Sequence, residues 1–406
     1  MNPAIGRRDF IRSVSAAAAL GLAGRGLGAA APGPVMPEAT PSKLPRWRGF
    51  NLLQKFVASV ENAPYREEDF ALVAGWGFDF VRLPMSYRCW SSPGRWREIN
   101  EAVLREIDQA VAYGRQYGIH VCLNFHRAPG YSVDRSIEEP FNLWTDTEAL
   151  EAASYHWGRF AARYKGVPNS ALSFDLLNEP GGKDPKTGEL LEDATYARVV
   201  RSLVGAIRAE SPQRLIIADG LMWGNLPVPA LAGLGIAQSG RGYQPMQVTH
   251  WKAGWIKGAD AWPRPQWPLA IAPGTLEGAR RQTERQKAVF RENPIFMAHA
   301  LEDDPALPWG RERFRRQLVA PWRALQGMGV GVHIGEFGAH NQTPHDVVLA
   351  WMGDLLACLK EAGLGWALWN LNGSFGVLDS KRGDVAYENF RGRKLDRAML
   401  ELLRES

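Results

Sequence analysis

The sequence of 406 residues contains only three cysteines, and these are scattered along the chain at Cys89, Cys122 and Cys358. An odd and widely spaced set does not form a disulfide framework, so a small cross-linked fold is excluded. Cys122 lies within an apolar run, and the simplest interpretation is that these cysteines are buried free thiols. The fold must then depend on an apolar core, for which 45% hydrophobic residues are sufficient.

The sequence also lacks a strong excess of either charge. The amino-terminal segment contributes a net +3 to the formal charge of +5, which leaves +2 for the rest of the chain; its charged residues are Arg7, Arg8, Asp9, Arg12 and Arg25. So small an excess, without a basic stripe, gives no reason to expect nucleic acid as a partner. The apolar run at 14–23 is too short to span a bilayer, and no membrane partner is expected.

The amino-terminal segment has the pattern of an export signal. Arg7 and Arg8 precede a short apolar run, and small residues at Ala29–Ala31 follow it. This order is typical of a twin-arginine signal peptide, with cleavage near Ala31. We therefore expect residues 1–31 to be the signal and the Pro-rich stretch 32–44 to be a linker outside the fold. The mature protein would be periplasmic or extracellular; the alternative is an uncleaved, disordered terminus.

Eight short apolar runs alternate with amphipathic segments over residues 45–406. Most runs are continuous, which is typical of parallel strands covered on both faces. The pattern predicts an α/β fold, a (β/α)8 TIM barrel in a single domain. The strand patterns lie at 47–53, 78–85, 119–125, 172–180, 214–220, 246–251, 330–338 and 365–373, and the helical patterns between and after them at 66–75, 98–117, 145–164, 195–209, 345–362 and 394–404.

An open, doubly wound sheet is the alternative fold. It usually has fewer strands, and no Gly-rich phosphate loop follows any strand here. The connection at 252–329 is longer than a barrel requires and carries five of the 16 tryptophans. Such an insertion either forms a wall or lid of the site or packs as part of a larger outer layer. The many tryptophans suggest exposed stacking surfaces as well as core residues.

Polar residues stand at the carboxyl ends of most predicted strands, where barrel enzymes place their active sites. Buried charges are costly unless they are paired, so a purely structural role for the whole set is disfavoured. Pro180 predicts an extended backbone at the residue before it. The candidate site residues are Arg82, His126, Asn178, Glu179, His250, Glu336 and Trp369.

Two carboxylic acids facing each other across a barrel suit the cleavage of a glycosidic bond. One acid must protonate the leaving oxygen, and the other must stay ionised. Arg82 is a permanent cation expected to keep Glu336 ionised, whereas the expected neighbours of Glu179 are only the neutral Asn178 and histidines. We therefore expect Glu179 to be the acid/base and Glu336 the nucleophile. A separation of ~5–5.5 Å would give retention of configuration, a distance that strand positions do not supply.

These motifs resemble glycoside hydrolase family 5, the cellulase-type retaining β-glycosidases. The resemblance rests on VRLP (81–84), LNFHRAPG (123–130), LLNEP (176–180), VTHW (248–251), IGEFG (334–338) and ALWN (367–370). It implies the same roles for Glu179 and Glu336, and it implies that Asn178 bonds the sugar 2-hydroxyl. It further implies that Arg82 holds the nucleophile, that His126 and His250 line the cleavage subsite, and that Trp369 is its stacking floor.

One position departs from the family pattern. The family usually has a tyrosine two residues after the histidine of its sixth strand, in contact with the nucleophile. Here His250 is followed by Trp251 and Lys252. Either Trp251 or another aromatic residue substitutes, or the role is lost. We expect Lys252 to point away from Glu336, because a second cation there would weaken the nucleophile.

Two other classes of function compete with this prediction. A metal-dependent barrel hydrolase would use His126, His250 and His333 as ligands, but the first strand lacks a histidine pair and His333 should face opposite to Ile334. A carbohydrate-binding barrel without catalysis would need tryptophans but not two carboxylates.

We expect no metal or cofactor, and a β-linked oligo- or polysaccharide as substrate. The first choice is endo-action on β-1,4-glucan, with β-mannanase, xyloglucanase and exo-acting β-glucosidase as alternatives.

Overall fold

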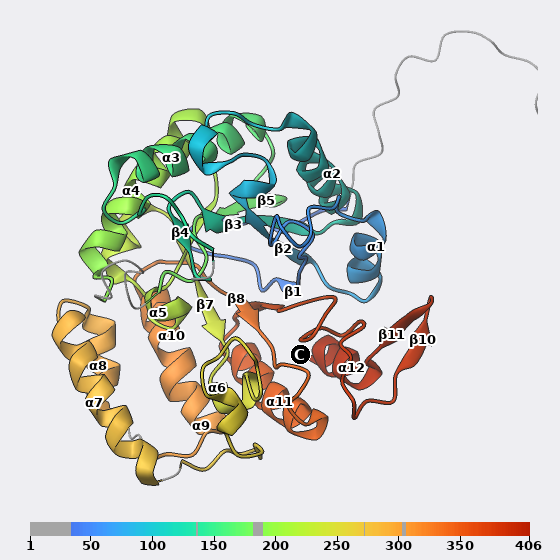
Figure 1. Cartoon of the computed structure of the whole chain (residues 1–406), viewed down its shortest axis with the longest axis vertical. Helices are drawn as coiled ribbons and strands as arrows, with labels where there is room; N and C mark the ends of the chain where they lie inside the picture. The colour runs from blue at the N-terminus through green and yellow to red at the C-terminus, as the bar shows by residue number, and fades with distance from the viewer. Residues whose placement is uncertain (1–33, 135–136, 182–189, 272, 303–305) are drawn as a thin grey trace, which may run out of the picture. The chain divides into compact units, whose positions relative to one another are not determined.

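Eight parallel strands form a closed barrel in the computed structural model, which describes residues 34–134, 137–181, 190–271, 273–302 and 306–406 (Figure 1). Each strand pairs in parallel with its neighbours, and the pairing of the second with the third strand completes the ring. The predicted (β/α)8 barrel is confirmed. The strands are β1 (Arg48–Asn51), β2 (Phe80–Ser86), β3 (His120–Ala128), β5 (Leu172–Asp175), β6 (Ile216–Asp219), β7 (Ala237–Gly242), β8 (Val332–Phe337) and β9 (Gly365–Leu368).

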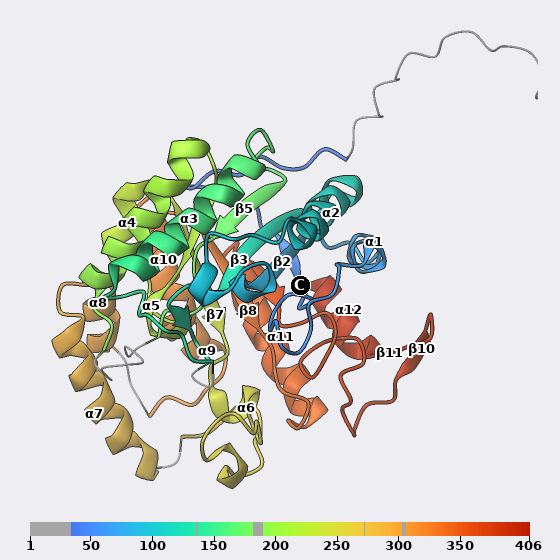
Figure 2. The same cartoon turned by 45° about the horizontal axis from the view of Figure 1, so that its top comes forward.

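Helices surround the barrel, six of them at the amphipathic patterns given above and a seventh, α10 (Ala320–Gly327), within the long connection at 252–329 (Figures 1 and 2). In α2 (Glu101–Tyr117), the Asn100 side chain accepts a hydrogen bond from the Ala102 amide at the start, and Gly118 ends the helix with a left-handed φ of 69°. The helices are α1 (Glu67–Gly75), α2 (Glu101–Tyr117), α3 (Thr147–Arg163), α4 (Asp193–Glu210), α10 (Ala320–Gly327), α11 (His345–Glu361) and α12 (Arg397–Glu405).

The remaining elements lie outside the barrel repeat. The long connection before β8 carries α7 (Pro273–Val289) and α8 (Pro294–Glu302), which lie beside one another, with α8 against α10 (Figures 1 and 2). The other elements are β4 (Tyr131–Ser132), α5 (Leu221–Gly224), α6 (Met246–Thr249), α9 (Arg311–Arg313), β10 (Glu388–Phe390) and β11 (Arg393–Leu395). Among the described residues, no helix is long and apolar enough to cross a membrane.

The predicted sixth strand at 246–251 is wrong. The sixth strand of the barrel is instead β7, whose sequence AQSGRG has no β-branched or aromatic residue and is therefore hard to predict as a strand. Its glycines are required by packing, because a Cβ at Gly240 would lie 2.7 Å from the Trp322 ring. Residues Met246–Thr249 form the short helix α6 instead.

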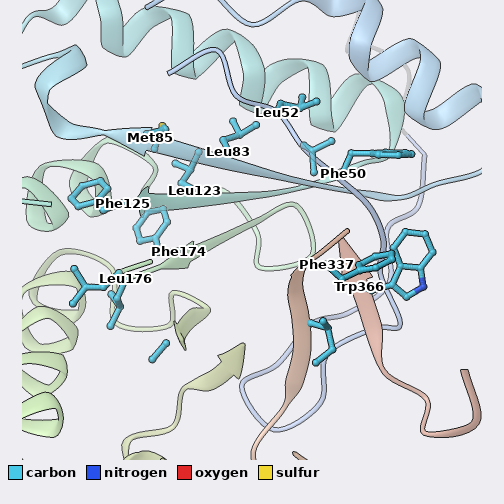
Figure 3. Packing of buried hydrophobic residues seen from close by; sticks show 14 of the residues in the cluster. Phe50, Leu52, Leu83, Met85, Leu123, Phe125, Phe174, Leu176, Phe337 and Trp366 are labelled. Carbon is cyan, nitrogen blue, oxygen red and sulfur yellow. The ribbon is translucent and has the colours of Figure 1, made fainter. Parts of the chain in front are cut away.

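The core divides into two apolar clusters because successive strand residues face opposite sides of the barrel wall. Outward residues of the strands pack against the helices, as Leu83, Phe125 and Phe174 do in Figure 3. Inward residues near the amino ends, among them Phe80 and Cys122, form a smaller apolar plug. Further along the same strands the inward residues become polar and charged, so the barrel interior is apolar at one end and ionic at the other.

The folded structure begins before residue 45. Ala39 is buried in the inner cluster, and the Pro41 carbonyl accepts a hydrogen bond of 2.7 Å from the Gly331 amide. Part of the stretch predicted as a linker therefore covers the amino end of the barrel. The predicted signal peptide lies outside the described residues.

Gly49 on β1 gives a test of the barrel packing. A Cβ at this position would lie 1.7 Å from the Phe80 carbonyl oxygen, which belongs to the backbone of β2 and cannot move independently. We expect Gly49→Ala to lower the free energy of unfolding by at least about 2 kcal/mol, measured by urea denaturation. Gly75→Ala is the control, because nothing lies within 4 Å of a Cβ there. Equal stability of the two variants would contradict the packing described.

Candidate active site

Glu336 lies near the end of β8, buried and held by two hydrogen-bond donors and a second nearby guanidinium. Arg82 Nη1 donates to Oε1 at 2.5 Å, and the Tyr243 hydroxyl donates to Oε2 at 2.9 Å. Arg241 Nη2 lies 3.4 Å from Oε1. The contact that the sequence predicted between Arg82 and Glu336 is therefore present, and both carboxylate oxygens are fixed. Burial and the charge of Glu336 raise the pKa of Tyr243 well above its usual value, so the phenol stays a donor.

Glu179 follows β5, and its side chain is 16% exposed. Burial raises its pKa to about 8, with the negative charge of Glu336 adding to the effect and Arg241 opposing it. The carboxyl group therefore keeps its proton near neutral pH. The expectation of uncharged neighbours was wrong, because Arg241 Nε donates to Glu179 Oε1 at 3.0 Å.

The backbone of Glu179 is also not extended, contrary to the prediction from Pro180. Its φ is 48°, in the left-handed region that non-glycine residues rarely adopt. Two hydrogen bonds hold this conformation. The Glu179 amide donates to Asp219 Oδ2 at 2.8 Å, and the Glu179 carbonyl accepts from the Tyr131 hydroxyl at 2.5 Å. Strain of this kind persists where the surroundings determine the backbone on both sides.

Four carboxyl groups and two guanidinium groups share this end of the barrel. Arg82 Nε donates to Asp175 at 2.8 Å, and Arg241 forms a two-pronged pair with Asp219. If all four acids were ionised, the cluster would carry an excess of negative charge. Burial and the charge of Asp219 raise the pKa of Asp175 to about 7. Protonation of Asp175 and Glu179 would leave the two remaining carboxylates balanced by the two arginines.

Asn178 connects the two arginines to the aromatic side of the site. Its Oδ1 accepts from Arg82 at 2.8 Å and from Arg241 at 3.0 Å, so its amide nitrogen must face elsewhere. That nitrogen lies 3.3 Å from His126 Nε2. The His126 ring stacks on Trp369 with 5.4 Å between centroids. Burial lowers the pKa of His126, so the ring is neutral and can accept from Asn178.

His250, Trp251 and Lys252 lie at or just after the end of the strand that was predicted wrongly, and the structure places them in different surroundings. His250 lies beside Tyr243, with 5.3 Å between ring centroids, and so belongs to the Glu336 side of the site. The indole nitrogen of Trp251 donates to the Trp262 carbonyl, and the Lys252 ammonium lies over the Trp251 ring at 4.4 Å. No described contact brings Trp251 to either carboxylate. Tyr243 provides the aromatic contact to Glu336, and Lys252 is turned toward Trp251.

Sequence reasoning missed Arg241, Tyr243, Asp175 and Asp219. The two aspartates could have been found, because each is the last residue of a strand in the apolar patterns LSFD and LIIAD. Arg241 and Tyr243 were hidden by the weak pattern of β7. The sequence Arg-Gly-Tyr could have indicated them, because its tyrosine stands two residues after a polar strand residue, as in the family pattern.

The three histidines considered as metal ligands have different surroundings. His333 packs against Phe80 at the amino end of the barrel, with 4.5 Å between ring centroids. His126 and His250 contact different aromatic residues at the opposite end. Within the described part of the chain, no group of three His, Cys, Asp or Glu side chains is arranged to hold a metal ion.

The raised pKa of Glu179 predicts a pH-dependent cost in stability. The carboxyl group of the unfolded chain ionises near its ordinary pKa, while that of the folded protein keeps its proton to about pH 8. The free energy of unfolding therefore falls as the pH rises between these two values. We expect Glu179→Gln to raise Tm, relative to the parent, by at least about 3 °C more at pH 8.5 than at pH 5. Glu151→Gln, at an exposed helix position, is the control. A Tm difference independent of pH would contradict the assignment.

Known proteins resemble this chain over most of its length. The family model for cellulase, glycosyl hydrolase family 5, matches residues 39–247. Endoglucanase C of Acetivibrio thermocellus is 25% identical over 328 residues, which cover 79% of this chain and 88% of the relative. Cellodextrinase A of Ruminococcus flavefaciens is 27% identical over 199 residues, 47% of this chain and 54% of the relative.

Solved structures agree. The crystal structure of a glycoside hydrolase is 37% identical, with a TM-score of 0.76, and the match covers 89% of this chain and 99% of that chain. Cel5A of Thermotoga maritima in complex with mannotriose is 19% identical, with a TM-score of 0.59 over 88% and 97% of the two chains, and supports the fold alone. The family model spans more than half of the sequence, and the chain belongs to glycoside hydrolase family 5.

Proposed function

We propose that this glycoside hydrolase is an endo-β-1,4-glucanase that retains anomeric configuration, with Glu179 as acid/base and Glu336 as nucleophile. The assignment of the two roles rests on the different environments of the two carboxyl groups. Glu336 is fixed by Arg82 and Tyr243 through both oxygens. Glu179 keeps a proton because it is buried near Glu336. One acid is thus ready to donate and the other to attack.

The reaction proceeds in two steps. Glu336 attacks the anomeric carbon as the glycosidic C–O bond breaks, and Glu179 gives its proton to the leaving oxygen. In the second step Glu179, now a carboxylate, takes a proton from water. The water oxygen bonds to the anomeric carbon, and the ester bond to Glu336 breaks with its electron pair returning to the carboxylate. Substitution on the same carbon twice gives net retention.

The remaining site residues would bind the sugar. The carbonyl of Asn178 is occupied by two arginines and one amide hydrogen faces His126, which leaves the other amide hydrogen for a sugar hydroxyl. Trp369, half-buried beside His126, offers an aromatic face for a pyranose ring. Two tryptophans are markedly exposed: Trp223, whose amide donates to the Pro180 carbonyl, and Trp255 in the long connection before β8. They would extend binding beyond one sugar.

The choice of β-1,4-glucan is supported by the relatives that are named endoglucanases. Other similar proteins are named glucan 1,3-beta-glucosidases, and one solved relative holds mannotriose. These similar proteins support exo-action and β-mannan as alternatives, and xyloglucan is a third alternative that an experiment must separate.

Hydrolysis of a panel of soluble polysaccharides tests this proposal. We expect carboxymethylcellulose to lose viscosity faster than reducing ends accumulate, which indicates internal cleavage, and cello-oligosaccharide products to appear first as the β-anomer by NMR. Glu336→Gln should lower kcat at least about 10³-fold while circular dichroism shows the same folded state at the assay temperature. Activity confined to mannan or xyloglucan, or release of single sugars only, would replace the substrate assignment. Full activity of Glu336→Gln would exclude the mechanism.

We propose further that the protein is exported by the twin-arginine route, on the basis of Arg7 and Arg8 ahead of a short apolar run. Expression with a twin-arginine translocase should give a mature protein that begins near residue 32, as read by amino-terminal sequencing. A variant with both arginines changed to lysine should remain uncleaved in the cytoplasm. Export of this variant at the parent level would contradict the proposal.

A further inference from the structure

Arg241 is the one described side chain that contacts both predicted catalytic carboxyl groups. Its Nε donates to Glu179 Oε1 at 3.0 Å, and its Nη2 lies 3.4 Å from Glu336 Oε1. Its side chain is 1% exposed, and Asp219 fixes it with a two-pronged pair. The guanidinium is therefore rigid, desolvated and charged at every working pH.

This cation stands where the family resemblance leads one to expect a different residue. The resemblance places a histidine two residues before the tyrosine that contacts the nucleophile. Tyr243 makes that contact here, and the residue two positions before it is Arg241. A histidine is easily neutral near pH 7, whereas an arginine is not. The site of this chain thus contains a fixed positive charge that the family pattern does not provide.

The effect of this charge differs between the two steps of the reaction. Before the first step Glu336 is negative and partly neutralises Arg241. In the glycosyl-enzyme, Glu336 is a neutral ester, so it no longer repels a negative charge on Glu179. Arg241 then has one anionic partner fewer and attracts the Glu179 carboxylate more strongly. This change favours loss of the Glu179 proton at the stage where a general base is needed.

We propose that Arg241 is a positioning residue that holds Glu179 as a carboxylate in the glycosyl-enzyme and thereby accelerates the second step, hydrolysis of the ester. The inference rests on the proposed roles of Glu179 and Glu336. Asp219 serves this function indirectly, since it fixes both Arg241 and the backbone amide of Glu179. The step balances as described above: water loses a proton to Glu179, and Glu336 regains its electron pair.

The two steps can be measured separately with 2,4-dinitrophenyl β-cellobioside. Its leaving group departs without protonation, so the burst of dinitrophenolate reports the first step and the steady rate reports the second. In Arg241→Gln we expect the steady rate to fall at least about tenfold while the burst rate constant changes less than twofold. Azide, an anionic nucleophile that needs no base, should restore the steady rate.

The pH profile gives a readout that a merely structural role would not produce. Loss of the cation should raise the pH at which the second step reaches half its maximum by about one to three pH units. Arg241→Lys, which keeps the charge, should recover part of the steady rate. If Arg241→Gln does not fold, Arg241→His carries the same expectation, because the resemblance places histidine here. Arg163→Gln, a surface pair with Asp108, is the control that should alter neither step.

The possible failures are distinguishable. A burst rate constant that falls as much as the steady rate, no rescue by azide, or an unchanged pH midpoint would overturn the role of Arg241. If the parent enzyme shows neither burst nor turnover on any aryl β-glycoside, or if Glu336→Gln is fully active, the proposed function itself fails and the inference fails with it.

Discussion

Two arginines pair with four acids inside this barrel, and the site depends on how these charges balance. Arg82 pairs with Asp175 and Glu336, and Arg241 pairs with Asp219 and Glu179. The six side chains are at most 16% exposed, so each charged group loses solvation that its partner must replace. The acids outnumber the cations, which is why burial leaves some of them protonated. The proton on Glu179 follows from the composition of the whole cluster rather than from one neighbour.

The rest of the barrel makes this ionic end possible. The inward residues of the strands change from aromatic and aliphatic at the amino end to charged at the carboxyl end, along the same few residues of each strand. The apolar plug and the segment around Ala39 close the far end. The charged cluster therefore sits on a packed floor, and all of its members except Glu179 lie on strands.

Most of the fold and the two central acids could be predicted from the sequence. Continuous apolar runs located seven of the eight strands, and polar residues after them located Arg82, Glu179 and Glu336. The remaining strand, β7, was not predicted because its residues satisfy packing rather than β-propensity: Trp322 leaves no room for a side chain at Gly240. Arg241 and Tyr243 were missed with it. The partners of Glu179 could not be predicted, since Asp219 and Arg241 meet it only through the closure of the ring.

The left-handed backbone at Glu179 has a consequence for how variation in this enzyme should be interpreted. The direction of the acid is set by the peptide units on either side of it, and these are held by Tyr131 and Asp219. The Tyr131 hydroxyl and the Asp219 carboxylate are committed to these contacts, so the enzyme's sensitivity to substitution extends beyond the groups that would bind sugar. In a deep mutational scan, losses of activity at Tyr131 would report a rotated Glu179 rather than a lost substrate contact, whereas losses at Asp219 would combine that rotation with the release of Arg241.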